Sequence, residues 1–556
     1  MTLENEWKKT KKLVREGYKI LEKEFSINIP APCLPAISPN KDTGIGSPQS
    51  EGAKEFFDFF DGLFHKALLG PTGRSFPPLY SPYESTYGYN PLFLNLEKLT
   101  TGEYGNLLSR KTLESIYNRK KKETEIDFVF VGRDYNKALQ ECYENFEKNL
   151  AKKQAFAVSL NRKIKLLEKE QSFLKDEALF FAPFNPHRYL FEEALGQLLE
   201  TEDHIPYIAD IEVKLPDSLV VQHPEWFLKG FTLGSPADAF ANAPRNWHFK
   251  VFDPDFIFNK DGSLGPAGQF LFNTFDHFFK TYSGGVRIDH FIGFVNPFVI
   301  SNQKDIPSGR LYSSPENPVL KKYAKTSTDE FTNIFQRIIL PAMEENHHTL
   351  YDIYPEDLGN RPEQMDAVME KCELGRMLVS QFVNPEKPDH IYRLKNANKK
   401  DIAVLDTHDT ASVYDFFTHL SETEREKHAR QLCQDLRFNY HPNLTSVKEL
   451  TRMKWAELLL SPAERVQAFF TSFLGQDGRY NEPGNPKKWR LRCSYQFKEL
   501  YFRNLLEGKA YNPLDAIALA IYARGEDFYH QNETFVQTLR SQEEILLNEI
   551  KSKYSF

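Results

Sequence analysis

The chain is 556 residues long, 40% of them hydrophobic and 14% aromatic, and it carries a formal net charge of −7 at pH 7. This length exceeds a minimal single domain and is enough to fill one large core with insertions. The negative net charge gives no electrostatic case for a nucleic-acid partner or an anionic membrane surface.

Strand-like runs recur along the chain with helical patterns between them, which is typical of a parallel α/β protein. Eight such strands would close a (β/α)8 TIM barrel, so we expect a single catalytic barrel over residues 1–556. We place the strand ends near residues 33–38, 66–70, 205–210, 284–290, 350–356, 377–382, 402–407 and 469–475.

The predicted strands are unevenly spaced. Two intervals are too long for single helices, so we expect large insertions at roughly 71–204 and 211–283, forming subdomains that wall a cleft. Residues 158–200 are expected to be helical. In SEGAKEFFDFFDGL, residues 50–63, the side chains Ala53, Phe56, Phe57 and Phe60 follow helical spacing and are predicted to be core contacts.

The stretch GGVRIDHF, residues 284–291, is predicted to be a buried strand that delivers an arginine and a carboxylate to one place. Side chains two apart share a face of a strand, so Arg287 and Asp289 should point together while Val286 and Ile288 pack outward. A guanidinium beside Asp289 favours its ionised form and fixes its orientation, as a carboxylate nucleophile requires. A structural ion pair at a strand end is the alternative.

Two further acidic motifs follow at predicted strand ends. In YDIYPEDLGN, residues 351–360, Glu356 and Asp357 are adjacent and face opposite ways, so only one of them can join the nucleophile candidate. In DIAVLDTHDT, residues 401–410, a strand stops just before a polar cluster that contains Asp409. Active-site groups of a parallel barrel lie where strands end at its C-terminal face, and three acids at three strand ends fit that plan.

The motifs RIDHF, PEDLG and THD, in this order and spacing, resemble those of the 4-alpha-glucanotransferases known as amylomaltases or disproportionating enzymes, glycoside hydrolase family 77. Glu356 follows Asp289 by 67 residues, and Asp409 follows Glu356 by 53. The likeness extends along most of the chain, through GIGSPQSEGAKEFFDFFDGL (44–63), LLGPTG (68–73), SPYESTYGYNPLFLNLEKL (81–99), HPEWF (223–227), RNW (245–247), MLVSQF (377–382) and GQDGRYNEPG (475–484).

The resemblance implies roles for the site residues. Asp289 would be the nucleophile, Glu356 the acid/base, and Asp409 the group that grips sugar hydroxyls and stabilises the transition state. His290 and His408 would bond to the same sugar ring, or else be ordinary strand-end histidines, and Arg287 would orient the nucleophile. Further substrate-binding residues implied in this way, each with a packing alternative, are Tyr83, Trp247, Asp217 and Asn481.

The resemblance also implies the reaction. A glucanotransferase must hold a sugar while one acceptor leaves and another arrives, which calls for a covalent intermediate and retention, with carboxyl groups about 5–5.5 Å apart. It would move alpha-1,4-glucan segments between maltooligosaccharides or glycogen-derived chains, with glucose or an oligosaccharide as acceptor and no cofactor or metal. A retaining alpha-glucan hydrolase and a degenerate glycan-binding protein without turnover are the alternatives.

The chain departs from the family pattern near the site. Ile292 stands where the family usually has arginine, and Thr410 where it usually has asparagine. Residues 64–67 replace a tryptophan-glutamine pair, and the block after Trp247 is altered to His248 and Phe249. The three acids are untouched, so these departures bear on chain-length preference, acceptor preference and rate.

The cysteines and the N-terminus bear on location. Five cysteines, an odd number, are scattered without CxxC spacing, which argues against a disulfide framework or a zinc site and favours a reducing compartment. The N-terminus is charged from the start, and the longest apolar run, 516–523, is far too short to span a bilayer. We therefore expect a cytoplasmic protein without a membrane partner.

Overall fold

The computed structural model describes residues 2–77, 80–84, 88–170, 172–199, 203–237, 243–482 and 488–554. Its centre is a sheet of eight parallel strands in the order β10-β11-β12-β1-β2-β3-β6-β9. Their bounds are β1 (Glu24–Asn28), β2 (Lys66–Leu68), β3 (Tyr207–Ile211), β6 (Gly285–Ile288), β9 (Ile353–Pro355), β10 (Met377–Val379), β11 (Ile402–Val404) and β12 (Arg465–Phe469).

The two outer strands of this order, β9 and β10, lie next to each other and bring the sheet close to a closed barrel. Asp357, just after β9, accepts hydrogen bonds from the backbone N–H of Met377 at 3.0 Å and from Arg376 Nε at 3.1 Å. The predicted (β/α)8 barrel is confirmed. Side chains that pack together inside it are Leu68, Ile208, Tyr354, Met377, Val379, Ile402 and Val404.

Seven of the eight predicted strand ends lie within or directly at the end of an observed strand. The first differs, because β1 ends at Asn28, several residues before the expected 33–38, and residues 31–33 form a single 3-10 turn. Pro30 and Pro32 account for the early end, since proline has no N–H to continue a ladder.

The helices that surround the barrel begin with capping side chains at several points. Ser50 accepts a hydrogen bond from Ala53 N at the start of α2 (Glu51–Phe60), and Ser421 and Glu424 form a capping box on α16 (Glu422–Leu436). The other surrounding helices are α1 (Leu3–Leu21), α10 (Pro266–Thr281), α11 (Ile292–Val295), α12 (Thr328–Phe331), α13 (Leu340–Glu345), α14 (Met365–Lys371), α15 (Val413–His419), α17 (Val447–Leu460), α18 (Phe470–Leu474), α19 (Phe497–Glu507), α20 (Pro513–Ala523) and α21 (Glu526–Tyr554).

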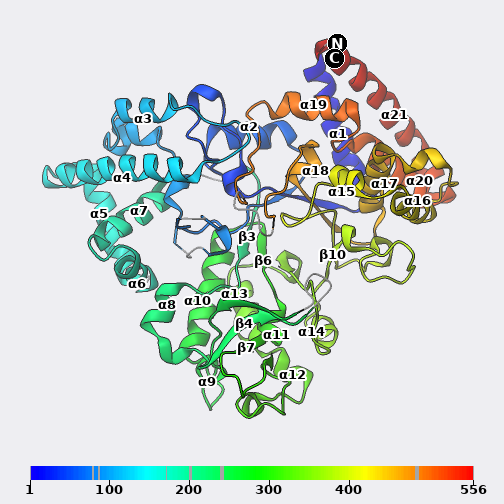
Figure 1. Cartoon of the computed structure of the whole chain (residues 1–556). Helices are drawn as coiled ribbons and strands as arrows, with labels where there is room; N and C mark the ends of the chain where they lie inside the picture. The colour runs from blue at the N-terminus through cyan, green and yellow to red at the C-terminus, as the bar shows by residue number, and fades with distance from the viewer. Residues whose placement is uncertain are drawn as a thin grey trace.

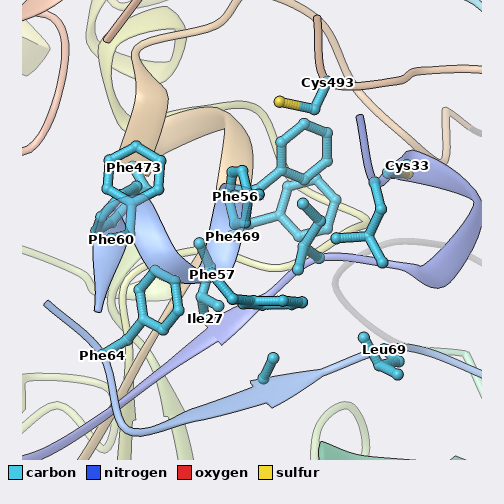
Figure 2. Packing of buried hydrophobic residues seen from close by; sticks show 14 of the residues in the cluster. Ile27, Cys33, Phe56, Phe57, Phe60, Phe64, Leu69, Phe469, Phe473 and Cys493 are labelled. Carbon is cyan, nitrogen blue, oxygen red and sulfur yellow. The ribbon is translucent and has the colours of Figure 1, made fainter. Parts of the chain in front are cut away.

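The buried face of α2 confirms the helical spacing read from the sequence. Phe56, Phe57 and Phe60 are at most 1% exposed and pack with Phe469 and Phe473, which come from β12 and α18 (Figure 2).

The two ends of the chain meet, because α1 packs against α21 and both termini lie together in Figure 1.

Two peripheral lobes extend from the barrel (Figure 1). The first is helical and lies between β2 and β3 in the sequence; the second contains a four-stranded antiparallel sheet in the order β5-β4-β7-β8. The helices of the first are α3 (Arg110–Tyr117), α4 (Phe128–Ala151), α5 (Ala155–Glu170), α6 (Ser172–Phe181) and α7 (Pro186–Leu199). The second contains α8 (Asp217–Gln222), β4 (Phe231–Ser235), β5 (Arg245–Phe249), α9 (Pro254–Ile257), β7 (Phe298–Ser301) and β8 (Gly309–Arg310).

The second lobe is assembled from two segments of the chain. Strands β4 and β5 lie within the interval 211–283, whereas β7 and β8 follow β6 and therefore lie beyond it. That the intervals 71–204 and 211–283 wall a sugar cleft stays a prediction. Within the described ranges, no helix is both long and apolar enough to cross a bilayer.

Candidate active site

Strand β6 places the first motif as its alternating pattern predicts. Val286 and Ile288 are fully buried among the aromatic side chains of α10 outside the barrel. Arg287 points to the other face, where its register partner on β3 is Asp210. Gly285 has φ +106°, and a Cβ there would lie 2.1 Å from the Asp352 carbonyl oxygen, so the second glycine of the motif is required by space and by backbone conformation.

Arg287 joins three carboxyl groups at the C-terminal end of the barrel. Its Nη1 lies 2.5 Å from Asp210 Oδ1, and its Nη2 lies 3.0 Å from Asp289 Oδ1 and 3.8 Å from Glu356 Oε2. The Arg287 side chain is only 8% exposed. A buried guanidinium between carboxylates holds them in place and offsets part of their mutual repulsion.

Glu356 is fixed by backbone donors and carries a perturbed pKa. Its Oε2 accepts a hydrogen bond from the His290 N–H at 2.9 Å, and its Oε1 accepts one from the Leu358 N–H at 3.2 Å. Burial, followed by the negative charge of Asp289, raises the pKa of Glu356 to about 8 against the opposing effect of Arg287. The carboxyl group is therefore largely protonated at neutral pH, as a general acid must be.

Asp357 faces away from this cluster. It is 1% exposed and binds Arg376, Arg361 and the Met377 N–H at the β9–β10 junction. The prediction that only one of the two adjacent acids joins Asp289 is confirmed, and the structure shows that it is Glu356.

The third motif lies in the loop after β11. Asp409 is 55% exposed; its Oδ2 lies 3.3 Å from His408 Nε2, and its Oδ1 accepts a hydrogen bond from the side-chain amide of Asn481. The Asn481 N–H also donates to the His408 carbonyl oxygen at 2.9 Å, and Arg479 donates to the Asp409 carbonyl oxygen at the same distance. The charge of Asp409 contributes to the raised pKa of Glu356, after burial and Asp289, so the two carboxyl groups lie within electrostatic reach of each other.

Two aromatic side chains named from the sequence reach this site. The Tyr83 ring stacks on His408 with centroids 5.0 Å apart, and its hydroxyl donates to Asp210 Oδ2 at 3.0 Å. Trp247, on β5, meets His290 edge to face with centroids 4.7 Å apart. The structure thus brings Tyr83 and Trp247 together with the acids from two different peripheral segments.

His290 has an unusual backbone and an unsatisfied ring nitrogen. Its φ is +47°, a left-handed conformation that is uncommon for residues other than glycine. Burial lowers the pKa of its ring to about 4, so the ring is neutral at pH 7. Its Nε2 is buried and finds no hydrogen-bond partner among the described residues. Such a nitrogen is a candidate to bond with a ligand hydroxyl.

Asp217 lies apart from the cluster. It is the first residue of α8, it is 58% exposed, and its carboxylate pairs with Lys214 at 3.1 Å. A substrate role for it stays a prediction. Pro483, which follows Asn481 in the same sequence block, lies outside the described residues.

Three residues near the site were not identified from the sequence: Asp210, Trp489 and Arg479. Asp210 lies at a predicted strand end and is only 2% exposed, so the strand-end rule that identified the other acids could have identified it. Trp489 packs on Tyr83 with centroids 5.5 Å apart, but it comes from the far end of the sequence, so no local pattern links the two rings.

The departures from the family pattern occupy well-defined places. Ile292 is 1% exposed and starts α11 within the core beside β6. Thr410 Oγ1 accepts a hydrogen bond from the Thr407 N–H at 3.0 Å and so closes the loop that carries Asp409. His65 Nδ1 accepts a hydrogen bond from the Phe25 N–H at 3.0 Å, and His248 has φ +62° within β5.

Across the described ranges, no three His, Cys, Asp or Glu side chains are arranged to hold a metal ion.

The sequence matches the model of a protein family described as 4-alpha-glucanotransferase over residues 200–497, more than half of the chain. An amylomaltase from Streptococcus agalactiae in complex with acarbose is 17% identical, with a TM-score of 0.67 over 88% of this chain and 100% of that one. An amylomaltase from Corynebacterium glutamicum is 15% identical, with a TM-score of 0.61 over 94% of this chain and 76% of that one. At these identities the two structures show a common fold. No curated protein matches the sequence.

Proposed function

Because the chain belongs to the 4-alpha-glucanotransferase family, we propose that it moves alpha-1,4-glucan segments between maltooligosaccharides or glycogen-derived chains by a retaining double displacement. The observation that carries this proposal is the pair of acids around Arg287. Asp289 Oδ1 lies 3.0 Å from Arg287 Nη2. Burial and the charge of Asp289 raise the pKa of Glu356 to about 8. One acid is prepared as a nucleophile and the other as a proton donor.

In the first step, Asp289 attacks the anomeric carbon of the donor sugar. A bond forms between that carbon and a carboxylate oxygen, the glycosidic bond breaks, and Glu356 gives its proton to the leaving oxygen. Arg287 stabilises the ionised nucleophile before attack. The products of this step are a glycosyl ester on Asp289 and a departing glucan with a new hydroxyl group.

In the second step, Glu356 works in the opposite direction. Ester formation removes the negative charge of Asp289, which is the second cause of the raised pKa of Glu356, so the ionised form of Glu356 is favoured in the intermediate. The Glu356 carboxylate takes the proton from the acceptor hydroxyl as that oxygen attacks the anomeric carbon. The original configuration is restored and Asp289 is released.

The remaining site residues would bind the sugars on either side of the reacting bond. Asp409 lies beside His408, His290 donates its backbone N–H to Glu356, and the unsatisfied His290 Nε2 suits a sugar hydroxyl. Tyr83 and Trp247 would offer ring faces to the acceptor, since flat apolar faces of sugars pack on aromatic rings. For Asn481 we propose support of Asp409, and for Asp217 a contact with a more distant sugar unit.

Incubation of the purified protein with maltotriose tests the proposed function. Transfer gives glucose together with maltopentaose and longer chains, whereas hydrolysis gives glucose and maltose without longer products. Absence of any product, with the wild-type protein folded, would indicate a glycan-binding protein without turnover. The Asp289→Asn variant is the control for traces of contaminating enzyme.

A further inference from the structure

Asp210 occupies a position that the reaction described above leaves unused. It lies on β3 directly opposite Arg287 in the register of the two strands, and it is 2% exposed. Its two oxygens have separate partners: Oδ1 accepts from Arg287 Nη1 at 2.5 Å, and Oδ2 accepts from the Tyr83 hydroxyl at 3.0 Å. Both oxygens act as acceptors, which is the arrangement that suits a carboxylate.

The contacts of Asp210 fix the guanidinium on which both reacting acids depend. Arg287 uses Nη1 for Asp210 and keeps Nη2 for Asp289 and Glu356. A planar guanidinium held through one nitrogen has its other nitrogen aimed in a fixed direction. Loss of the Asp210 contact would therefore free Arg287 to rotate or to move toward the other carboxyl groups.

We propose that Asp210 is a positioning residue for the transfer reaction, anchoring Arg287 between the two reacting acids and tying the segment of Tyr83 to them. This inference rests on the proposed function. Asp210 acts through Arg287 and touches neither the reacting sugar carbon nor the leaving oxygen in this scheme. It also links the donor-side acids to an aromatic ring on the proposed acceptor side.

The charge of Asp210 has a measurable consequence for Glu356. One guanidinium serves three carboxyl groups, and Asp210 takes up part of its positive potential. Burial raises the pKa of Asp210, and the contact with Arg287 counters that effect. If the Asp210 charge is removed while Arg287 stays, the guanidinium acts more strongly on Glu356 and the pKa of Glu356 falls. Among the described residues, the titratable and charged groups that act on this cluster include Tyr83, Arg287, Asp289, His290, Arg310, Glu356, Tyr392, His408 and Asp409.

The test is the pH profile of kcat/KM for maltotriose transfer in Asp210→Asn. We expect the alkaline limb, where the general acid loses its proton, to move toward acid by about 1 pH unit. The loss of rate relative to wild type should deepen as the pH rises, and it should shrink when the donor is alpha-glucosyl fluoride, whose leaving group needs no proton. A uniform loss at every pH, with an unmoved limb, would overturn the proposal.

A matched control is available far from the site. Asp435, on α16, is a buried carboxylate bound to Arg393 at 2.7 and 2.9 Å, so Asp435→Asn removes the same charge from another buried pair. This variant should lower the thermal unfolding temperature and leave the pH profile in place. If it moves the limb as Asp210→Asn does, the shift reflects general loosening and the proposal fails.

A milder variant covers the case in which Asp210→Asn does not fold. Tyr83→Phe removes only the hydrogen bond to Asp210 Oδ2 and keeps the ring stacked on His408. It should move the limb in the same direction by a smaller amount, because Asp210 holds its charge less firmly without that donor. A shift in the opposite direction would contradict the arrangement.

A measurement without substrate separates this inference from the proposed function. The pKa of Glu356 follows from the pH dependence of the unfolding free energy of each protein, compared with its own Glu356→Gln variant. That pKa should be lower in the Asp210→Asn variant than in wild type, whatever the protein transfers. If the wild-type protein forms no glucans longer than its substrate while this shift is present, only the proposed function is ruled out. If the wild-type protein is active but the shift is absent, only the role of Asp210 is ruled out.

Discussion

The two ends of the barrel both bury charged side chains, but they balance the charges differently. At the N-terminal end, Lys66 lies 3.1 Å from both Glu24 and Asp352. Arg465 beside them is 2% exposed and donates to the carbonyl oxygens of Tyr351 and Ile353 at 2.7 and 2.8 Å. Lys66 therefore pairs with two carboxylates there and Arg465 adds a second positive charge near Glu24, whereas at the C-terminal end one guanidinium serves three carboxyl groups.

This difference in balance appears in the protonation of the acids. At the N-terminal end, although burial opposes it, the charge of Lys66 holds the pKa of Asp352 below its usual value. At the C-terminal end, burial and the neighbouring Asp289 raise the pKa of Glu356 to about 8. A balanced set of charges keeps its ionised form and supports the fold, while an excess of acid keeps a proton available for chemistry. Substitutions at the N-terminal end should therefore lower mainly the stability of the protein, and substitutions at the C-terminal end mainly its transfer activity.

Asp289→Asn should have the largest effect of all. The amide keeps the shape of the side chain but cannot form a glycosyl ester, so transfer should fall roughly 1,000-fold or more. The unfolding temperature should stay the same or rise, because the variant removes one of the crowded acids. Initial rates with maltotriose, together with thermal unfolding, check both expectations. A variant that retained a tenth of wild-type transfer would rule out Asp289 as the nucleophile.

Glu356→Gln should lower the transfer rate less than Asp289→Asn does, and the size of the loss should depend on the donor. Transfer from maltotriose should fall by about 100- to 10,000-fold, because the leaving oxygen needs a proton. The first-turnover release of fluoride from alpha-glucosyl fluoride should fall far less, since fluoride leaves without a proton and the second step, in which Glu356 is the base, has not yet occurred. Parallel rates with both donors give the comparison. Equal damage to both would mean that Glu356 supports the structure of this end instead of donating a proton.

The local pattern of the sequence was enough to place the three acids and their orientation. The two-residue period of a strand put Arg287 and Asp289 on one face, and the same rule separated Glu356 from Asp357. Both follow from backbone geometry within a few residues. The barrel followed from the number and the spacing of the strands.

The missing parts of the site depend on contacts between distant segments. The contact of Asp210 with Arg287, 77 residues later in the chain, exists only because β3 pairs with β6 in a register that sets the two residues opposite each other. Trp489 reaches Tyr83 from a loop beyond β12. The antiparallel sheet likewise takes β7 and β8 from beyond the expected insertion, because strand pairing joins segments on both sides of β6. Register and loop docking of this kind are set by tertiary packing.

Arg465→Met should affect the N-terminal end in the opposite sense to the catalytic substitutions. It removes charge-assisted hydrogen bonds to buried carbonyl oxygens, so the unfolding free energy should fall by about 3 kcal/mol. Transfer per folded molecule should remain near wild type at temperatures where the variant is folded. Chemical denaturation and maltotriose rates measure the two quantities. Arg430→Met, on the surface of α16, is the matched control and should leave stability almost unchanged, because its ion pair with Glu426 is exposed to solvent.

Glu356 should also make stability depend on pH. Its pKa in the folded state, about 8, lies above the value of 4.5 for an exposed glutamate, so the folded state binds the proton more tightly between these pH values. The unfolding free energy should therefore fall as the pH rises through this window and level off above it, by at most about 1.4 kcal/mol for each pH unit crossed. Subtracting the curve of Glu356→Gln from that of wild type isolates this contribution. A flat difference would contradict the raised pKa.

Trp247→Ala should have the smallest effect, confined to the choice between acceptor and water at the catalytic end. Transfer outcompetes hydrolysis only when the acceptor is bound and oriented, and good orientation of a reactant can be worth roughly 7–11 kcal/mol. Trp247 contributes only part of such binding, because its ring meets His290 edge to face at the margin of the acid cluster. The ratio of hydrolysis to transfer should therefore rise a few-fold while total donor cleavage changes little. Trp226→Ala, a ring in the same lobe that stacks on His223, should leave the ratio unchanged. If Trp247→Ala instead lowered both reactions in parallel, its ring would pack the wall of the site, and acceptor choice would have to be sought at Tyr83 and His408.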